Sequence, residues 1–255
     1  MSKQAGRNLS LSPPRKLVVD LMHFCGKVPG ATVERPLRLA ALIAARRACV
    51  PRPSWCAIFI KAMSIVGARH PQFRRAYMPV PWPHLYEHPD NVANFTIERR
   101  YRGEDVVLLV QVRRPERRSL TELDGIIRTC KHEPVESVKS FRRALRLSKV
   151  PWPFRRLVWW ASLNLIGKLR AHNFGTFSIS SASSEGAGIL AMRPLINTTL
   201  HYGLFDDRGY LPARLTFDHR VLDGAFVARG LVELEEVLQT AIRQELLEAR
   251  AVKAA

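Results

Sequence analysis

The sequence predicts an α/β fold in which one mixed β-sheet is flanked by helices. Apolar residues recur with helical spacing near both ends of the chain, whereas β-branched residues alternate in its middle and in its last third. The helices precede, interrupt and follow the strands. They show no regular alternation with the strands, which argues against a doubly wound parallel sheet.

Three helices are expected in the first 70 residues. The first follows Ser12, whose hydroxyl can cap a helix that opens with two prolines and continues with leucines at helical spacing. Residues 36–49 and 54–69 carry the apolar stripes of a second and a third helix. Residues 1–12 are polar, and we expect a loose segment there.

The middle of the chain changes to strands and then returns to helix. Residues 94–101 and 105–112 have the composition of two strands joined by a short turn. Residues 119–148 open with the capping-box sequence Ser-Leu-Thr-Glu, which predicts a helix. Pro134 should break this helix near its middle.

The last third is expected to contain buried strands and one long helix. Residues 174–180, 200–205 and 214–218 are short apolar runs, and the segments between them hold glycines and aspartates that favour turns. Residues 223–250 form one amphipathic pattern at helical spacing.

The composition excludes disorder and indicates anionic partners. Of the 255 residues, 47% are hydrophobic, and the formal net charge is +18. Arginine supplies 31 of the 40 cations, and its planar group suits phosphate and carboxylate. The arginine-rich residues 113–118 and 142–143 lack a nucleic-acid-binding signature, so we do not expect nucleic acid as a partner.

The cysteines and the apolar runs indicate the compartment. The four cysteines show no zinc-site spacing, so we expect no metal and a reducing, cytoplasmic location. The first 15 residues contain no apolar core of a signal peptide. The longest apolar runs are shorter than the roughly 18–20 residues that span a bilayer.

The pattern that carries chemistry lies between the last strand and the long helix. His219 follows the strand, and Asp223-Gly224 opens the helix four residues later. A neutral imidazole held at a strand end can take a proton from a thiol, hydroxyl or amine. Ser180 ends an earlier strand, where its hydroxyl could donate a hydrogen bond to an oxyanion.

These segments resemble a known enzyme family. FDHRVLDGA, at residues 217–225, and GTFSIS, at residues 175–180, are similar to signatures in the catalytic domain of the dihydrolipoamide acyltransferases. That domain forms the core of the 2-oxoacid dehydrogenase complexes, and chloramphenicol acetyltransferase is a more distant relative. Residues 194–197 and Arg15-Lys16 also match, and the resemblance covers roughly residues 13–246.

The resemblance implies a role for each matching residue. His219 matches the general base that deprotonates the acceptor, and Ser180 matches the hydroxyl that stabilises the tetrahedral oxyanion. Asp223 matches a carboxylate that commonly pairs with an arginine, for which Arg15 is our candidate. Asp223 could equally serve as a helix cap. Gly224 is expected to allow a tight turn into the last helix.

The resemblance also implies an assembly and a substrate. We expect the chloramphenicol-acetyltransferase-like two-layer sandwich, arranged as a homotrimer or a cage of trimers. The histidine and the hydroxyl of each site would then come from different chains. Coenzyme A would carry the acyl group.

The chain departs from the family in three places. It has no room for a lipoyl domain or a subunit-binding domain, so we expect one catalytic domain over residues 13–250 and no lipoyl group. Pro29-Gly30-Ala31 replaces the family's histidine-containing channel motif. Residues 146–170 form a longer and tryptophan-rich segment, which could line a pocket for a long acyl chain, pack on a neighbouring subunit or lie on a membrane surface.

The sequence therefore predicts a stand-alone acyltransferase. It would move an acyl group from acyl-CoA, or from the thioester of an acidic acyl-carrier protein, to a thiol, hydroxyl or amine. A non-catalytic oligomeric scaffold with the same fold is the alternative. A third interpretation is a lipid acyltransferase that contacts the membrane peripherally through residues 150–170.

Overall fold

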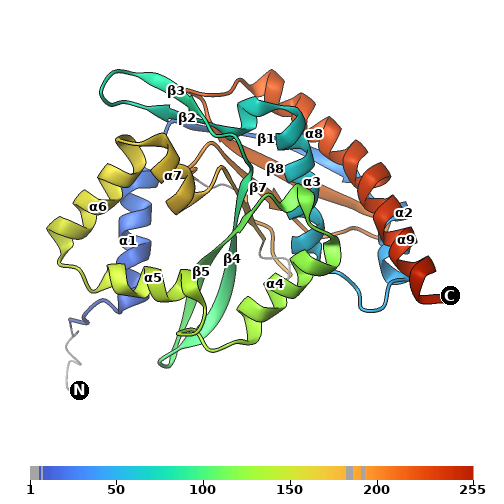
Figure 1. The fold of residues 1–255 in the computed structure, drawn as a ribbon, viewed down its shortest axis with the longest axis horizontal. Helices are drawn as coiled ribbons and strands as arrows, with labels where there is room; N and C mark the ends of the chain where they lie inside the picture. Colours follow the sequence, from blue (N-terminus) through green and yellow to red (C-terminus); the bar gives the residue numbers. More distant parts are fainter. Residues whose placement is uncertain (1–5, 7, 182–185, 191–192, 255) are drawn as a thin grey trace, which may run out of the picture.

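The computed structural model describes residues 6, 8–181, 186–190 and 193–254. Residues 1–5 and 7 of the expected loose segment, residues 1–12, lie outside the described residues. Residues 182–185, which follow Ser180, also lie outside them. Within the described ranges the main feature is a six-stranded sheet in the order β1-β8-β7-β6-β4-β5 (Figure 1). The strands are β1 (Gly30–Arg38), β4 (Val92–Tyr101), β5 (Glu104–Arg113), β6 (Phe177–Ser180), β7 (Thr198–Tyr202) and β8 (Tyr210–Asp218).

The sheet is mixed. β8 pairs antiparallel with β1 and with β7, whereas β6 pairs in parallel with β7 and with β4. β4 and β5 form an antiparallel hairpin. A separate two-stranded sheet consists of β2 (Arg75–Met78) and β3 (His84–Glu87). The expected class, a mixed sheet flanked by helices, is confirmed.

One face of the sheet packs against helices to form the main core. Helices α3 (Trp55–Arg69), α4 (Leu120–His132) and α8 (Gly224–Val237) cover this face (Figure 1). A π-helical turn, η4 (Leu238–Ile242), continues α8 into α9 (Arg243–Ala254), which packs on α2 (Ala40–Arg47). Several phenylalanines in this core are fully buried, each contributing about 1.5–3 kcal/mol. They include Phe59, Phe95, Phe177 and Phe217.

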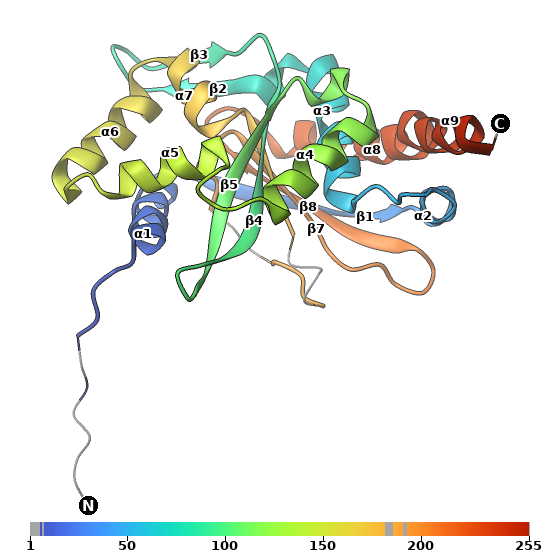
Figure 2. The same cartoon turned by 60° about the horizontal axis from the view of Figure 1, so that its bottom comes forward.

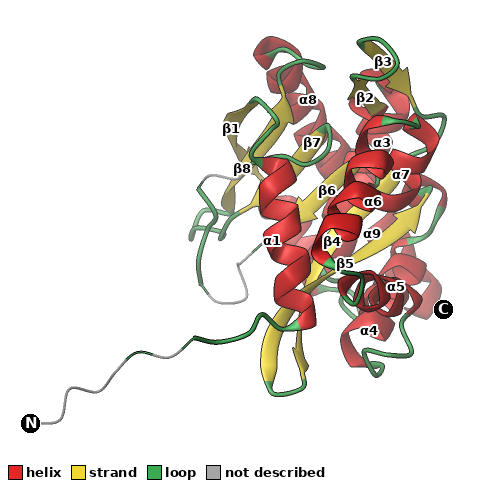
Figure 3. Cartoon of the chain, turned by 90° about the vertical axis from the view of Figure 1, so that its left-hand side faces the viewer, coloured by secondary structure: helices red, strands yellow, loops and turns green. Residues whose placement is uncertain are grey.

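A second group of helices lies beside the β4–β5 hairpin. It contains α1 (Pro13–Cys25), α5 (Lys139–Ser148), α6 (Trp152–Asn164) and α7 (Gly167–Phe174), and Figures 2 and 3 show it from two sides. Trp159 of α6 stacks on Phe24 of α1, with ring centroids 5.8 Å apart. Asp20 of α1 and Arg155 of α6 form a buried ion pair. α1 and α6 are therefore joined by both apolar and ionic contacts.

Serine hydroxyls cap three of the helices, as predicted for Ser12 and Ser119. The Ser12 hydroxyl, and also that of Ser54, accepts a hydrogen bond from the backbone N–H three residues later, at 3.3 Å each. Ser119 and Glu122 form the complete capping box. α4 ends before Pro134, and α5 begins after it, as predicted. None of the helices in the described ranges combines the length and the apolar character needed to cross a bilayer.

The expectation of one helix over residues 36–49 is wrong at its start. Residues 30–38 form the edge strand β1, which pairs with β8 over its whole length, and α2 begins only at Ala40. Pro36 lies opposite Pro212 in this pairing. Proline is tolerated on an edge strand, where one side of the backbone needs no partner, so here Pro36 did not mark a helix start. The β2–β3 hairpin was also not predicted.

Candidate functional site

His219 lies on a turn that the backbone holds in place. β8 ends at Asp218, whose N–H donates to the Asn197 carbonyl at 2.9 Å. The His219 N–H donates to the Pro29 carbonyl, also at 2.9 Å. The residue that follows the strand is therefore fixed to the segments before β7 and before β1.

The side chains on either side of His219 reinforce this turn. Asp218 is fully buried, and its carboxylate accepts hydrogen bonds from the Arg220 backbone N–H, Nε and Nη2 at 3.0, 2.9 and 2.7 Å. The Arg220 guanidinium also lies 4.4 Å from the centroid of the Tyr77 ring. The sequence analysis did not single out Asp218 or Arg220, although both flank His219 directly. Because a buried carboxylate needs its charged partner, this pair fixes the local backbone.

A buried arginine, Arg170, lies near Asp218. Arg170 donates to the carbonyl oxygens of Tyr77 and Leu163 at 3.0 Å each and of Leu195 at 3.2 Å. Burial lowers the pKa of Arg170 to about 10, and the nearby Asp218 carboxylate opposes this shift. The charge on Asp218 is thus balanced by two arginines rather than one.

The side chains of His219 and Asp223 face outward. His219 is 54% exposed and Asp223 is 88% exposed, and the His219 Nδ1 and Asp223 Oδ1 atoms are 3.9 Å apart. This distance is too long for a hydrogen bond but short enough for an ion pair. Asp223 stands at the N-cap of α8, yet its side chain accepts no capping hydrogen bond. Among the described residues, His219 is therefore the only predicted site residue that Asp223 contacts within the chain.

Ser180 and His219 do not meet in one chain. Ser180, the last residue of β6, is in register with His201 of β7, and His201 is in register with Arg214 of β8. His219 lies five residues further along β8 from Arg214, which corresponds to about 16 Å at the usual strand rise. Two strand spacings across the sheet add to this separation. The two predicted catalytic groups therefore lie toward opposite ends of the sheet.

The two residues predicted to be structural behave differently from expectation. The Arg15 guanidinium lies 3.5 Å from the Glu104 carboxylate, so the expected pair of Arg15 with Asp223 is not formed within the chain. Gly224 is the first residue of α8, and it is not among the described glycines with a positive φ. A Cβ there would meet only the Val33 side chain, at 4.0 Å. Hence the backbone does not require glycine at this turn.

A buried histidine lies next to Ser180. His201 is only 3% exposed. Burial lowers the pKa of His201 to about 4 against an opposing interaction with the Ser180 backbone, and Arg214 lowers it further, so the ring is neutral at pH 7. The sequence analysis gave His201 no role, because a lone histidine within an apolar strand carries no pattern of its own.

The tryptophan-rich segment packs largely within its own chain. α6 buries Arg155 and Trp159 toward α1, and α7 buries Arg170. The other sides of α6 leave Phe154, Leu157 and Trp160 exposed, and Trp152 is exposed at the start of the helix. The segment therefore has one internal face and one apolar external face.

Comparison with solved structures identifies the fold. No protein-family model matches the chain, and no curated protein matches its sequence. The dihydrolipoamide acetyltransferase of Azotobacter vinelandii is similar, with a TM-score of 0.66 at 18% identity over 96% of each chain. The cubic core of the pyruvate dehydrogenase multienzyme complex gives 0.65 at 18% identity, again over 96% of each chain. The fold is that of a dihydrolipoamide acetyltransferase core.

A chloramphenicol acetyltransferase shares the architecture of this acetyltransferase-core fold more distantly. Its TM-score is 0.50 at 12% identity, over 86% of this chain and 94% of that one. The expected chloramphenicol-acetyltransferase-like class is confirmed. In this fold the His219 turn closes one end of the sheet and Ser180 lies toward the other.

Proposed function

We propose that the protein is an acyltransferase with His219 as its general base. The donor is an acyl-CoA, or the thioester of an acyl-carrier protein, and the acceptor is a thiol, hydroxyl or amine. The observation that carries this proposal is the anchored turn, in which backbone and arginine contacts hold a half-exposed imidazole at a strand end. The acetyltransferase-core fold supports it.

The chemistry follows from the imidazole's surroundings. Nδ1 of His219 faces the Asp223 carboxylate, so Nε2 is the nitrogen available to an acceptor. Nε2 takes the acceptor's proton as the acceptor's lone pair forms a bond to the thioester carbonyl carbon. The tetrahedral oxyanion then collapses, the carbon–sulfur bond breaks, and the leaving thiolate takes the proton from the imidazolium. General-base catalysis of this kind contributes about 10²–10⁴-fold.

The oxyanion would be stabilised by Ser180 of a neighbouring copy. Since His219 and Ser180 lie toward opposite ends of one sheet, a site that uses both must join two chains. A homotrimer or a cage of trimers meets this requirement, because a repeated head-to-tail interface closes into a ring. One similar structure is a cubic core.

The assignment of Asp223 draws on the Azotobacter vinelandii structure. That work concerned the role of a serine, a histidine and an asparagine in catalysis, with the asparagine four positions after the histidine. Asp223 stands four positions after His219. We infer that its carboxylate orients the imidazole and favours the imidazolium that forms during transfer.

Release of free CoA tests the proposal. A panel of short- to long-chain acyl-CoAs is incubated with the wild type and with His219→Ala, with and without a dithiol acceptor. The proposal expects acceptor-dependent release that falls about 100-fold or more in His219→Ala. Arg229→Ala, on the helix that follows the turn, serves as the matched surface control. Release that is equal in wild type and His219→Ala would favour the non-catalytic scaffold.

Peripheral membrane contact is a separate proposal. The exposed Trp152, Phe154 and Leu157 on α6, in a chain of formal net charge +18, suit the interface of an anionic bilayer. It requires no change in the acyl-transfer chemistry.

A further inference from the structure

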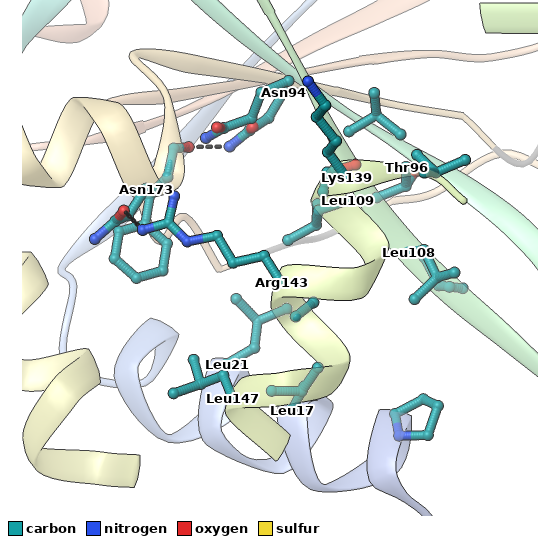
Figure 4. Close-up of a pocket in the computed structure, with 18 of the residues that line it drawn as sticks. Leu17, Leu21, Asn94, Thr96, Leu108, Leu109, Lys139, Arg143, Leu147 and Asn173 are labelled. Atoms are coloured by element: carbon teal, nitrogen blue, oxygen red, sulfur yellow. Dashed lines mark hydrogen bonds between the residues drawn. The ribbon is translucent and has the colours of Figure 1, made fainter. Parts of the chain in front are cut away.

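A large groove separates the β4–β5 hairpin from the second group of helices. Its volume is about 1350 Å³, and it is lined by α1, α5 and α6 on one side and by β5 on the other (Figure 4). Small-molecule sites usually occupy about 300–1,000 Å³. The groove contains neither His219 nor Ser180, so it is distinct from the proposed catalytic residues.

The middle of the groove is aliphatic. Alternate residues of β5 point away from the main core, and Val107 and Leu109 are partly exposed for this reason. Leu17 and Leu21 of α1 and Leu147 of α5 line the facing wall. Apolar side chains that line both walls favour a ligand with an aliphatic chain.

Three buried polar atoms in the groove lack partners. Within the described residues, Asn94 Oδ1, Gln111 Nε2 and Trp159 Nε1 have no hydrogen-bond partner, and all three residues line the groove. Asn94 and Gln111 face each other across the hairpin. Native proteins rarely leave such atoms unpaired, because each costs about 1–3 kcal/mol. A ligand oxygen next to Gln111 would accept a hydrogen bond from its Nε2, whereas Asn94 Oδ1 is an acceptor and needs a donor.

The same end of the groove is cationic. Arg113, Lys139 and Arg143 line it, and in the described ranges none of them has a carboxylate within 4 Å. The acidic lining residues, Glu104 and Asp105, lie at the far end of β5 and each pairs with an arginine. The excess positive charge thus gathers where the unpaired amides are.

The polar end and the aliphatic wall are continuous. In Figure 4 Arg143 lies between the amides of Asn94 and Asn173 and the leucines of α1 and α5. Arg143 Nη2 donates to Asn173 Oδ1 at 2.6 Å, which holds the guanidinium at this junction. From Gln111 to Asp105, β5 spans about 20 Å at the usual strand rise. That length accommodates an extended aliphatic chain.

We propose that this groove binds a long-chain carboxylate of the fatty-acid class. Its head accepts hydrogen bonds from Arg143 and from the Gln111 amide, and its chain lies between Leu109 and the leucines of α1 and α5. Neither the head nor the chain contacts His219. The inference goes beyond the proposed acyl transfer, since it concerns binding alone.

Calorimetric titration of the full chain tests the chain and the head separately. The probes are octanoate, dodecanoate and hexadecanoate, each below its micellar concentration, beside the uncharged alcohol of each length. Affinity should rise with length, by at most about fourfold for each added CH₂. Each carboxylate should bind more tightly than its alcohol. Affinity that is independent of length, equal binding of acid and alcohol, or no binding at all would overturn the proposal.

Matched variants locate the binding. Arg143→Ala should weaken dodecanoate binding about tenfold, the usual scale for a hydrogen bond to a charged group. Arg142→Ala, next to it on α5 but outside the groove, should not. Leu109→Ser should weaken binding of the longer acids, whereas Leu85→Ser, on the exposed β2–β3 hairpin, should not. Equal effects within either pair would refute the assignment.

His219→Ala separates this site from catalysis. It should bind dodecanoate like the wild type, whatever its effect on CoA release. A loss of binding in His219→Ala would mean that the carboxylate occupies the catalytic site instead of the groove.

Discussion

Complementation between two inactive variants tests the shared site most directly. Ser180 and His219 lie at least about 16 Å apart along the strands of one chain, so a single copy cannot bring both to one thioester. His219→Ala keeps Ser180, and Ser180→Ala keeps His219. A site formed between the two variants would therefore have both groups intact.

The expected magnitude follows from the geometry of a closed ring. Each site needs an intact histidine from one subunit and an intact serine from a defined neighbour. Random assembly of equal amounts gives about one intact site in four overall, but a trimer that contains both variants always has one intact site among its three. Mixed trimers should then show about a third of the wild-type rate, while each variant alone shows about a hundredth or less.

The assay compares CoA release before and after subunit exchange. The two variants carry different affinity tags, are mixed in equal amounts, unfolded and refolded together, and assemblies with both tags are isolated. Wild type treated in the same way gives the reference rate. Mixed assemblies no more active than the separate variants would refute the reasoning that Ser180 and His219 serve one site across an interface.

Four further predictions follow from other contacts. Arg155→Ala should lower the free energy of unfolding by about 3 kcal/mol, because the buried Asp20 carboxylate keeps only its 3.5 Å contact with Arg156, and the double variant Asp20→Leu/Arg155→Met should recover much of this in urea denaturation. Arg220→Ala should reduce kcat for CoA release and leave the far-ultraviolet circular dichroism spectrum unchanged, because it loosens only the turn that holds His219. An unchanged kcat would contradict this. The pKa of His201 is about 4 in the folded protein and 6.5 in the unfolded chain, so the unfolded chain binds more protons between these values. The free energy of unfolding should therefore fall by up to about 3 kcal/mol as the pH drops from 6.5 to 4, and His201→Gln should show a smaller fall in the urea midpoint. Vesicles with anionic lipid should shift tryptophan emission to shorter wavelength in the wild type and less in Phe154→Glu, whereas equal shifts would argue against membrane contact through α6.

The sequence predicted those features that depend on nearby residues. Ser12 and Ser119 cap their helices as expected, since a cap needs only a hydroxyl and the backbone three residues later. The position of His219 after a strand was predicted from the apolar residues just before it in the sequence. The strand β1 was missed because its existence depends on pairing with β8, some 180 residues away in the sequence.

Contacts between distant segments account for the rest of what the sequence did not reveal. No local sequence pattern indicates that Arg15 forms its ion pair with Glu104 and not with Asp223. The environment of His201 arises from three strands and could not be deduced from the residues beside it in the chain. The groove likewise needs α1, α5 and β5 together.

The buried Arg170 gives this part of the molecule a common unfolding behaviour. Its guanidinium is satisfied by carbonyl groups of Tyr77, Leu163 and Leu195, which belong to segments far apart in the sequence. If one of these segments detached, a buried charge would lose an acceptor, so partial opening is disfavoured. We therefore expect the β2–β3 hairpin, α6 and the segment before β7 to exchange their amide hydrogens as one cooperative unit.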